Sequence, residues 1–214
     1  DQAKKIINEN RPPKTQGERM VLNNYRAIEF IKERKHEPLT TAMILELHRL
    51  VTRKTLQDAS KEGAFRAPSD NIVVEHPASG DILHTPPDAH ELKERAKALC
   101  DFANAESDEG PFIHPVIRAI ILHFMLAYDH PFVDGNGRTA RALFYWSALS
   151  DGYWLLEFIS ISKQIKEAPI KYGSAFLETE TDDGDLTYFI NNQLEMIARA
   201  IDALDVFIRR KKAE

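Results

Sequence analysis

Apolar residues recur at helical spacing along most of the chain. Over residues 17–33 they fall mostly three or four positions apart, with charged residues between them, which predicts an amphipathic helix. Thr40 and Thr41 precede a second apolar series, and a threonine in that place caps a helix by accepting a backbone hydrogen bond. This second helix is expected to end before the polar stretch at Gln57.

Residues 71–87, NIVVEHPASGDILHTPP, follow a different pattern. Two short apolar runs flank Pro77, Ser79 and Gly80, and this combination predicts a β-hairpin. A two-stranded ribbon is marginally stable alone, so we expect the hairpin to lean on the helical body as a flap that clamps a ligand or partner. The alternative is a surface loop without a function.

Helical periodicity resumes over residues 88–105. Pro115 opens the next helix, where a missing N–H is tolerated, and that helix continues through VIRAIILHFMLAYDH. This helix and the one expected over residues 138–149 are apolar on most faces, so the two should form the centre of the molecule. A last pair of helices is expected over residues 161–176 and 186–208, joined by the acidic turn ETETDDGD.

These elements predict an all-α fold, a helical bundle with one small β-hairpin flap. A chain of 214 residues, 43% of them hydrophobic, buries one substantial core, so residues 1–214 are expected to form a single domain. Within it we distinguish an N-terminal helical segment, residues 1–35, and a core of about residues 40–200.

The composition of the chain limits its expected cellular location and the kinds of molecule that it is expected to bind. The formal net charge of −5 supplies no broad positive field, so direct binding of nucleic acid is not expected, and the basic residues 209–212 are interpreted as the solvated end of a helix. The longest apolar run, residues 119–128, is too short to cross a membrane, which takes about 20 apolar residues. Cys100 is the single cysteine and cannot form an internal disulfide, so a reducing, cytoplasmic location is expected.

The stretch HPFVDGNGRTAR, residues 130–141, lies between the two central helices and carries the candidate chemistry. Pro131 disfavours helical backbone at the residue before it, so the first helix should end at His130 and leave the imidazole at the mouth of a tight loop. Gly135, Asn136 and Gly137 then lead into the next helix, where free backbone N–H groups attract an anion such as phosphate.

Three further side chains of the loop favour a polyphosphate ligand. Arg138 and Arg141 are three positions apart on the second helix, so they share a face and can hold neighbouring phosphate oxygens. Asp134 offers the carboxylate oxygen that Mg²⁺ prefers when it bridges substrate phosphates. A base, a metal ligand, an anion site and two guanidinium groups together indicate phosphoryl or nucleotidyl transfer.

The loop matches H-x-F-x-(D/E)-G-N-G-R-x-x-R at every specified position, and in this it resembles the Fic family. GAFR at residues 63–66, the hairpin, HPVIRAIILHF before the loop and GDLTYFINNQL near the end are similar to other landmarks of that family. The resemblance therefore covers most of the chain.

The resemblance implies a protein adenylyltransferase that uses ATP and Mg²⁺. In this family His130 would deprotonate a Tyr, Ser or Thr hydroxyl of a target protein, which attacks the α-phosphorus of ATP and releases pyrophosphate. Asp134 would bind Mg²⁺, and Phe132 would turn inward as an anchor of the nucleotide site. The backbone of residues 135–137 would form the anion hole, and Arg138 and Arg141 would hold the outer phosphates. The flap, residues 71–87, would pair with the target's backbone as an added strand.

Two further residues are candidates, Glu9 by the same resemblance and Tyr172 by its residue type. Many members carry an inhibitory segment, (S/T)-x-x-x-E-(G/N), whose glutamate pairs with the second arginine of the loop. Glu9 and Asn10 match its end, whereas Lys5 stands where the hydroxyl residue is expected, so Glu9 is a candidate regulatory partner of Arg141 or an ordinary surface residue. Tyr172 is a candidate adenine contact, although an aromatic residue at helical spacing is more often part of a core.

Other functions remain open at this stage. The same fold could remove AMP from a modified protein or transfer another phosphate-linked group, as other members of the family do. A non-catalytic helical adaptor is the alternative of another class, and a divalent metal cluster of His114, His123 and His130 with an aspartate is a further one. The sequence leaves open which protein is modified and whether the chain is a monomer or a homo-oligomer.

Overall fold

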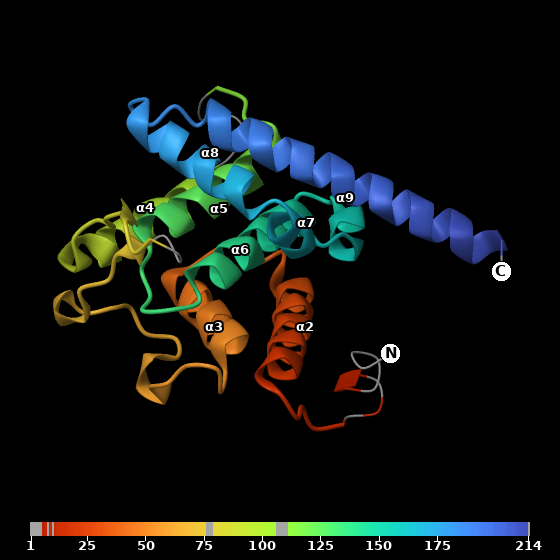
Figure 1. The fold of residues 1–214 in the computed structure, drawn as a ribbon, viewed down its shortest axis with the longest axis horizontal. Helices are drawn as coiled ribbons and strands as arrows, with labels where there is room; N and C mark the ends of the chain where they lie inside the picture. Colours follow the sequence, from red (N-terminus) through yellow and green to blue (C-terminus); the bar gives the residue numbers. More distant parts are fainter. Residues whose placement is uncertain (1–5, 8, 10, 76–78, 106–110, 214) are drawn as a thin grey trace.

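The computed structural model describes residues 6–7, 9, 11–75, 79–105 and 111–213, and in this part of the chain it is predominantly helical (Figure 1). The α-helices are α2 (Gln16–Arg34), α3 (Thr41–Thr52), α4 (Leu92–Asn104), α5 (Pro115–Asp129), α6 (Asn136–Ser150), α7 (Ile161–Glu167), α8 (Pro169–Thr181) and α9 (Thr187–Ala213). Short 3-10 helices are η1 (Ala59–Lys61), η2 (Pro68–Asp70), η3 (Ala89–Glu91) and η4 (Trp154–Phe158). The expectation of a helical bundle with a small hairpin is confirmed.

Helix starts follow the capping residues. The side chain of Thr40 accepts a hydrogen bond from the Met43 N–H at 3.2 Å, which confirms the predicted cap of α3. Pro115 is the first residue of α5, and His114 before it accepts from the Val116 N–H through Nδ1 at 3.2 Å. Each cap thus satisfies one of the N–H groups that the first turn of a helix leaves without a partner in the helix.

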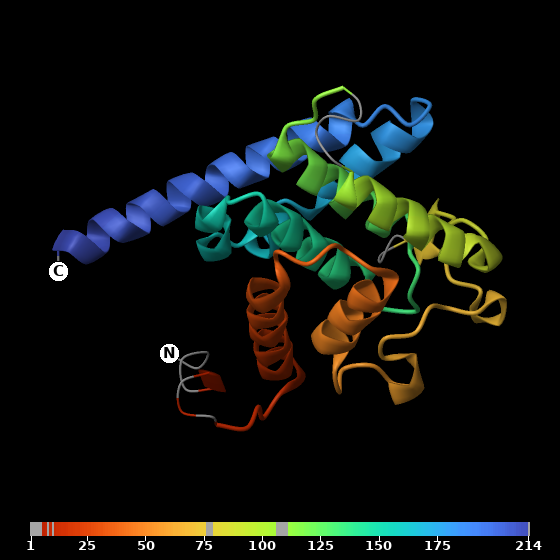
Figure 2. The same cartoon turned by 180° about the vertical axis from the view of Figure 1, so that it is seen from behind.

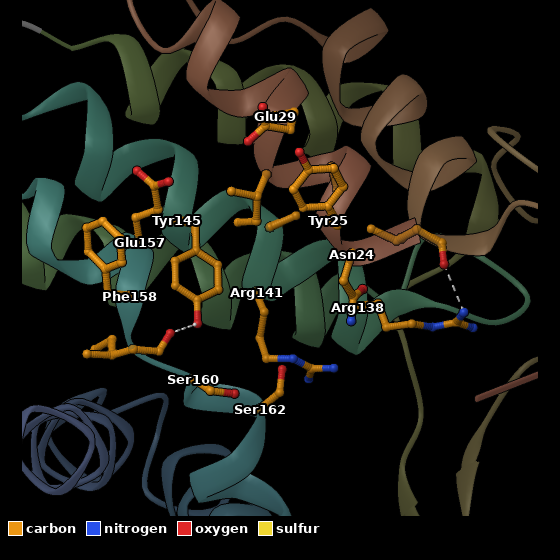
Figure 3. A pocket seen from close by; sticks show the side chains of 15 residues that line it. Asn24, Tyr25, Glu29, Arg138, Arg141, Tyr145, Glu157, Phe158, Ser160 and Ser162 are labelled. Atoms are coloured by element: carbon orange, nitrogen blue, oxygen red, sulfur yellow. Dashed lines mark hydrogen bonds between the residues drawn. The ribbon is translucent and has the colours of Figure 1, made fainter. Parts of the chain in front are cut away.

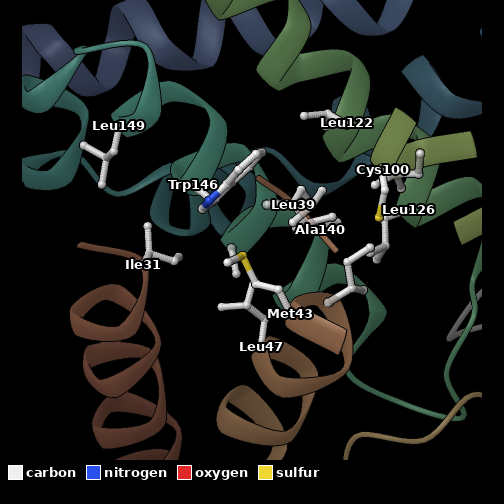
Figure 4. Close-up of a cluster of buried hydrophobic side chains, with 14 of the residues drawn as sticks. Ile31, Leu39, Met43, Leu47, Cys100, Leu122, Leu126, Ala140, Trp146 and Leu149 are labelled. Atoms are coloured by element: carbon white, nitrogen blue, oxygen red, sulfur yellow. The ribbon is translucent and has the colours of Figure 1, made fainter. Parts of the chain in front are cut away.

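The pair α5 and α6 lies at the centre, as their apolar circumference predicts. On one side they pack with α2, α3 and α4 around a core that includes Ile31, Leu47, Leu126 and Trp146 (Figure 4). On the other side they pack with η4, α7, α8 and α9 around a second core that includes Phe144 and Phe189. Because both faces of the pair are covered, the loop between the two helices is held from two sides.

The hairpin consists of β1 (Val74–Glu75) and β2 (Ile82–His84), which pair antiparallel with Val74 opposite His84. It is the one sheet in the described residues, and it lies beside the α5 and α8 end of the bundle. The turn residue Pro77 lies outside the described residues. The flap predicted over residues 71–87 is therefore present as a short ribbon next to the loop of residues 130–141.

The C-terminal region differs from expectation at its helix boundaries: α8 runs to Thr181, into the stretch ETETDDGD expected as a turn, and α9 runs to Ala213. A single helix was expected over residues 161–176, but the chain forms α7 and α8 with a break at Ala168, whose backbone is not helical. Pro169 causes the break, since the residue before a proline avoids helical dihedral angles. The last helix, α9, extends well beyond the body of the molecule in both views (Figures 1 and 2). Within the described parts of the chain, no helix is long and apolar enough to cross a membrane.

Candidate active site

His130 directly follows α5 and takes a left-handed backbone conformation, with φ of 44°. Its N–H still bonds to the Leu126 carbonyl at 3.1 Å, so the helix ends there as predicted. The ring Nδ1 lies 3.2 Å from the Ala127 carbonyl oxygen, which only accepts, so Nδ1 carries the proton and donates. The other ring nitrogen, Nε2, is therefore the basic atom of the neutral imidazole.

The surroundings of His130 favour its neutral form. Burial lowers the pKa of His130, and the positive charges of His84 and Arg66 act in the same direction, against the bond to Ala127 and the carboxylate of Asp134. A histidine that stays neutral at the working pH can accept a proton from a substrate hydroxyl. The geometry of His130 thus fits the role of general base that the sequence predicts for it.

Phe132 and Asn136 hold the loop in shape. The Phe132 side chain is fully buried, so it anchors the loop and does not contact a ligand directly. The Asn136 side chain accepts from the Phe132 N–H at 2.9 Å and donates to the Phe132 carbonyl at 2.8 Å. Both ends of that amide are thus used, and Asn136 can serve a ligand only through its backbone N–H.

His48 of α3 is a supporting residue that the sequence analysis missed. It is fully buried, and its ring stacks on Phe132 with centroids 3.7 Å apart. Its Nδ1 accepts from the Gly63 N–H at 2.9 Å, so Nε2 carries the proton and donates to the Asp134 carbonyl at 2.8 Å. The sequence carries no signal for this role, because His48 lies in an ordinary amphipathic helix far from the loop in the chain.

Arg66 is a second missed support. Its Nε donates to the His130 carbonyl at 2.8 Å, and a terminal nitrogen donates to the Pro87 carbonyl beyond the flap. The Arg66 N–H bonds to the Pro131 carbonyl at 2.9 Å. The GAFR segment therefore fastens the start of the loop to the base of the flap. Its only signal in the sequence was its likeness to a family landmark.

Gly135 is required by both its conformation and its surroundings. Its φ is 87°, and an added Cβ would lie 2.5 Å from Thr52 Cγ2. We expect Gly135→Ala to lower the free energy of unfolding by roughly 1–3 kcal/mol more than Gly152→Ala, because crowding adds to the backbone strain. Gly152 is the matched control, with φ of 85° and no atom within 4 Å of an added Cβ. Urea denaturation measures both, and equal losses would contradict the steric argument.

The N-terminus of α6 offers an anion site. The first bond within the helix runs from the Thr139 N–H to the Gly135 carbonyl at 2.9 Å, so the N–H groups of Asn136, Gly137 and Arg138 come before it. The Gly135 N–H is already bonded to the Asp134 carboxylate. Of residues 135–137, expected to form an anion site, Asn136 and Gly137 thus have backbone N–H groups at the start of the helix, and Arg138 follows them.

Asp134 is exposed at the mouth of the loop. Its other carboxylate oxygen accepts from Arg138 at 3.1 Å, and 63% of the side chain surface remains accessible. One accessible carboxylate next to a phosphate site fits Mg²⁺, which keeps several waters and takes its remaining ligands from the substrate. In the described residues no group of three or more potential metal-ligating side chains converges, which excludes there the alternative of a histidine cluster.

The two arginines of the loop differ in their hydrogen-bond partners. Arg138 donates to the Val51 carbonyl and the Thr55 hydroxyl, each at 3.0 Å, besides Asp134. Arg141 has no hydrogen bond or ion pair in the described residues, its Nε is buried without a partner, and burial lowers its pKa. Both line a cavity of about 360 Å³ beside Tyr25 of α2 (Figure 3). A buried donor without a partner is costly, and the guanidinium of Arg141 lines the cavity, so Arg141 is placed to receive an anion there.

A second cavity, of about 280 Å³, contains His130 and the flap. Its lining also includes Gly137 and Tyr172, and Val74 and Leu83 line it from the flap. An added Cβ on Gly137 would lie 3.2 Å from a terminal nitrogen of Arg141, so Gly137 lies where the two cavities approach each other. The structure thus brings His130, the start of α6, Arg141 and Tyr172 together around one site.

Tyr172 is held in place by His123. Its hydroxyl lies 2.9 Å from His123 Nε2, and burial raises the pKa of Tyr172 to about 12. His123 is fully buried in α5 and contributes to this contact rather than to a metal site. The aromatic ring of Tyr172 therefore presents a fixed surface to the cavity that contains His130.

His123 makes stability depend on pH. Burial lowers the pKa of His123 to about 3, whereas an unfolded histidine titrates near about 6.5. Between these values the unfolded chain binds a proton that the folded chain does not, so stability falls as the pH falls below about 6.5. From about pH 7 to 5 we expect the natural chain to lose roughly 1–2 kcal/mol more than His123→Gln in urea denaturation. Parallel losses would show that His123 is not responsible.

Glu9 is not brought to Arg141. It lies in a bend before α2 with an exposed side chain, and no ion pair joins the two residues in the described part of the chain. Lys5 and Asn10, which completed the sequence comparison, lie outside the described residues. The pairing expected from the sequence is thus absent from this conformation.

Known proteins match the same region. Protein adenylyltransferase Fic of Nematostella vectensis is 35% identical over 109 residues, which make up 51% of this chain and 22% of that protein. Protein adenylyltransferase fic-1 of Caenorhabditis elegans is 33% identical over 120 residues, 56% of this chain and 21% of that protein. The chain therefore spans about a fifth of the length of these curated relatives.

Two solved structures share the fold. A Fic domain containing signaling protein from Bacteroides thetaiotaomicron has a TM-score of 0.75 at 23% identity, covering 100% of this chain and 80% of that chain. A Fic family protein from Desulfovibrio desulfuricans has a TM-score of 0.73 at 22% identity, covering 96% and 59%. The model of the Fic/DOC family matches residues 38–148, half of the chain, and these contain the whole loop of residues 130–141. The chain belongs to the Fic/DOC family.

Proposed function

We propose that the chain transfers AMP from ATP to a Tyr, Ser or Thr hydroxyl of a target protein. One observation carries the proposal: a histidine with a basic Nε2 shares a cavity with the residues that begin α6, and Arg141, whose Nε has no hydrogen-bond partner among the described residues, approaches Gly137 there. The protein adenylyltransferases among the relatives support the same reaction.

The reaction follows from these groups. His130 Nε2 accepts the proton of the target hydroxyl as its oxygen attacks the α-phosphorus. The bond between the α-phosphorus and the oxygen bridging to the β-phosphate breaks, and pyrophosphate leaves with the electron pair. Backbone N–H groups of Asn136 and Gly137 stabilise the charge on the α-phosphate oxygens. The product is a phosphodiester between AMP and the target protein.

The nucleotide is proposed to span both cavities. The base and ribose lie against Tyr172, and the outer phosphates reach Arg141 and Arg138, whose charge they satisfy. Asp134 would hold Mg²⁺, which neutralises phosphate charge and favours departure of pyrophosphate. Because Gly137 has no side chain, the nucleotide can pass beside it from one cavity to the other.

The target is proposed to dock on the flap. An extended segment can add to the exposed edge of a sheet through main-chain hydrogen bonds, which places one of its side chains without reading its sequence closely. The exposed Ile82 of β2 would contact such a segment, while Leu83 and His84 line the cavity.

Labelled ATP tests the reaction. Label in the α-phosphate should become covalently bound to protein in the presence of Mg²⁺, whereas label in the γ-phosphate should not. Release of AMP from a modified protein without any labelling from ATP would instead indicate hydrolytic removal of AMP. If calorimetry detects no binding of Mg-ATP, the chain is an adaptor and the proposal is wrong.

Regulation by Glu9 is tested separately. Because Glu9 does not contact Arg141 in this conformation, we expect Glu9→Gly to leave the rate of self-modification with labelled ATP unchanged. Glu195→Gly on α9 is the control, because Glu195 forms only an exposed ion pair with Arg199. A large rise in rate for Glu9→Gly alone would show that Glu9 pairs with Arg141 in another conformation.

A further inference from the structure

His84 of the flap is joined to two helices of the body. Its Nε2 lies 2.7 Å from the Tyr128 carbonyl of α5, and its Nδ1 lies 3.0 Å from a carboxylate oxygen of Glu180 in α8. The side chains of His84 and Glu180 are 10% and 23% exposed, so the contact is largely shielded from water. Its ring also packs on the Tyr128 ring, with centroids 4.9 Å apart.

The two partners of His84 determine its protonation. A carbonyl oxygen only accepts, and an ionised carboxylate only accepts, so both ring nitrogens must donate. The contact is therefore complete when the imidazole is positively charged, and it is then an ion pair with a charge-assisted hydrogen bond. A neutral ring keeps one of the two bonds and turns a lone pair toward the other acceptor.

The position of this contact links it to the chemistry. His84 lines the same cavity as His130, and Glu180 and Tyr128 line it too. The groups that face His84 are Glu180 of α8, Tyr128 of α5 and His130 directly after α5, and the opposite strand of its own ribbon carries Glu75. The charge of His84 also lowers the pKa of His130, which favours the basic form.

We propose that the ion pair of His84 with Glu180 is a latch that fixes the flap against α5 and α8, and so positions the acceptor segment of the target over His130. This inference rests on the proposed AMP transfer for its effect on activity. His84 acts through the flap and is a positioning residue. His84 is not proposed to bind the outer phosphates, because Arg138 and Arg141, which are proposed to hold them, line the other cavity.

Substitution of His84 tests the latch. His84→Leu should slow covalent labelling from α-labelled ATP roughly 10–100-fold, because the acceptor is no longer held in line. Its affinity for Mg-ATP, measured by calorimetry, should stay near that of the natural chain. His90→Leu is the matched control, since His90 is an exposed histidine in η3 and should change neither value.

The variant Glu180→Gln distinguishes an ion pair from simple packing of His84, because only an ion pair makes the labelling rate of the natural chain relative to that of the variant depend on pH. A glutamine amide can donate to the neutral ring, so its latch persists without the second proton on His84. The labelling rate of the natural chain divided by that of Glu180→Gln should fall as the pH rises, because the natural latch needs a proton on both ring nitrogens of His84 and the latch of Glu180→Gln does not.

Hydrogen exchange separates failure of the latch from failure of the proposed function. In His84→Leu the amides of residues 82–84 should exchange at least about tenfold faster than in His90→Leu, whether or not the chain transfers AMP. Unchanged exchange, unchanged labelling or a flat ratio across pH would each overturn the latch. If exchange is faster in His84→Leu but the natural chain gives no label from ATP, the latch stands and the proposed function is wrong.

Discussion

The variant His130→Asn is expected to transfer AMP roughly 10²–10⁴-fold more slowly than the natural chain, which is the usual contribution of a general base. Nε2 of His130 is the basic atom at the site, and asparagine has no atom that can take up the proton. Asparagine also tolerates the left-handed backbone of this position, φ of 44°, so the fold should be retained.

Three measurements complete this experiment. The thermal midpoint and the affinity for Mg-ATP should stay close to those of the natural chain, because the variant removes the base and leaves the start of α6 intact. In the natural chain the rate should fall at acid pH with an apparent pKa below the usual value for histidine, since burial lowers the pKa of His130. Undiminished transfer by His130→Asn would exclude this residue as the base.

The variant Arg141→Met is expected to have opposite effects on stability and on binding. Without nucleotide, methionine removes a buried donor, Nε, that has no partner in the described residues, so the free energy of unfolding should rise by roughly 1–3 kcal/mol. With nucleotide, the loss of charged hydrogen bonds to phosphate should weaken Mg-ATP binding roughly 10–100-fold. Urea denaturation and calorimetry measure the two effects.

Arg138→Met provides the contrast. Arg138 donates to Val51, Thr55 and Asp134, so its removal should destabilise the protein even without nucleotide. Arg199, which forms an exposed ion pair with Glu195, is the neutral control. If Arg141→Met destabilises the ligand-free protein as Arg138→Met does, then Arg141 has a structural partner and the argument for a phosphate there fails.

The sequence predicted most of the fold because local signals and tertiary packing agree. The caps at Thr40 and Pro115 and the apolar circumference of α5 and α6 all have the positions that were expected. The break between α7 and α8 was missed because the apolar spacing continues through it, although Pro169 marks it. Helical periodicity describes which side chains are buried and is insensitive to a single interrupted turn.

The site was predictable where its residues are adjacent in the chain. His130, Asp134 and the arginines lie in one loop, so their chemistry could be read together. His48, Arg66 and His84 come from α3, the segment after it and the flap, and they reach the loop only in the folded chain. Their side chains support backbone carbonyls, and such contacts leave no pattern in the sequence.

The spatial relation of the two arginines was the least predictable feature. Their spacing places them on one face of α6, but only the structure shows that Arg138 has partners whereas Arg141 has none in the described residues. The bonds of Arg138 depend on how α6 packs against α3, which brings Val51 to it.

A crystal structure with Mg²⁺ and an ATP analogue that cannot be cleaved between the α- and β-phosphates tests the central claim most directly. We predict α-phosphate oxygens at about 3 Å from the backbone nitrogens of Asn136 and Gly137, with His130 Nε2 facing the α-phosphorus and Arg141 bonded to an outer phosphate. A nucleotide bound elsewhere, or a His130 ring turned away from it with Arg141 still unpaired, would contradict the account.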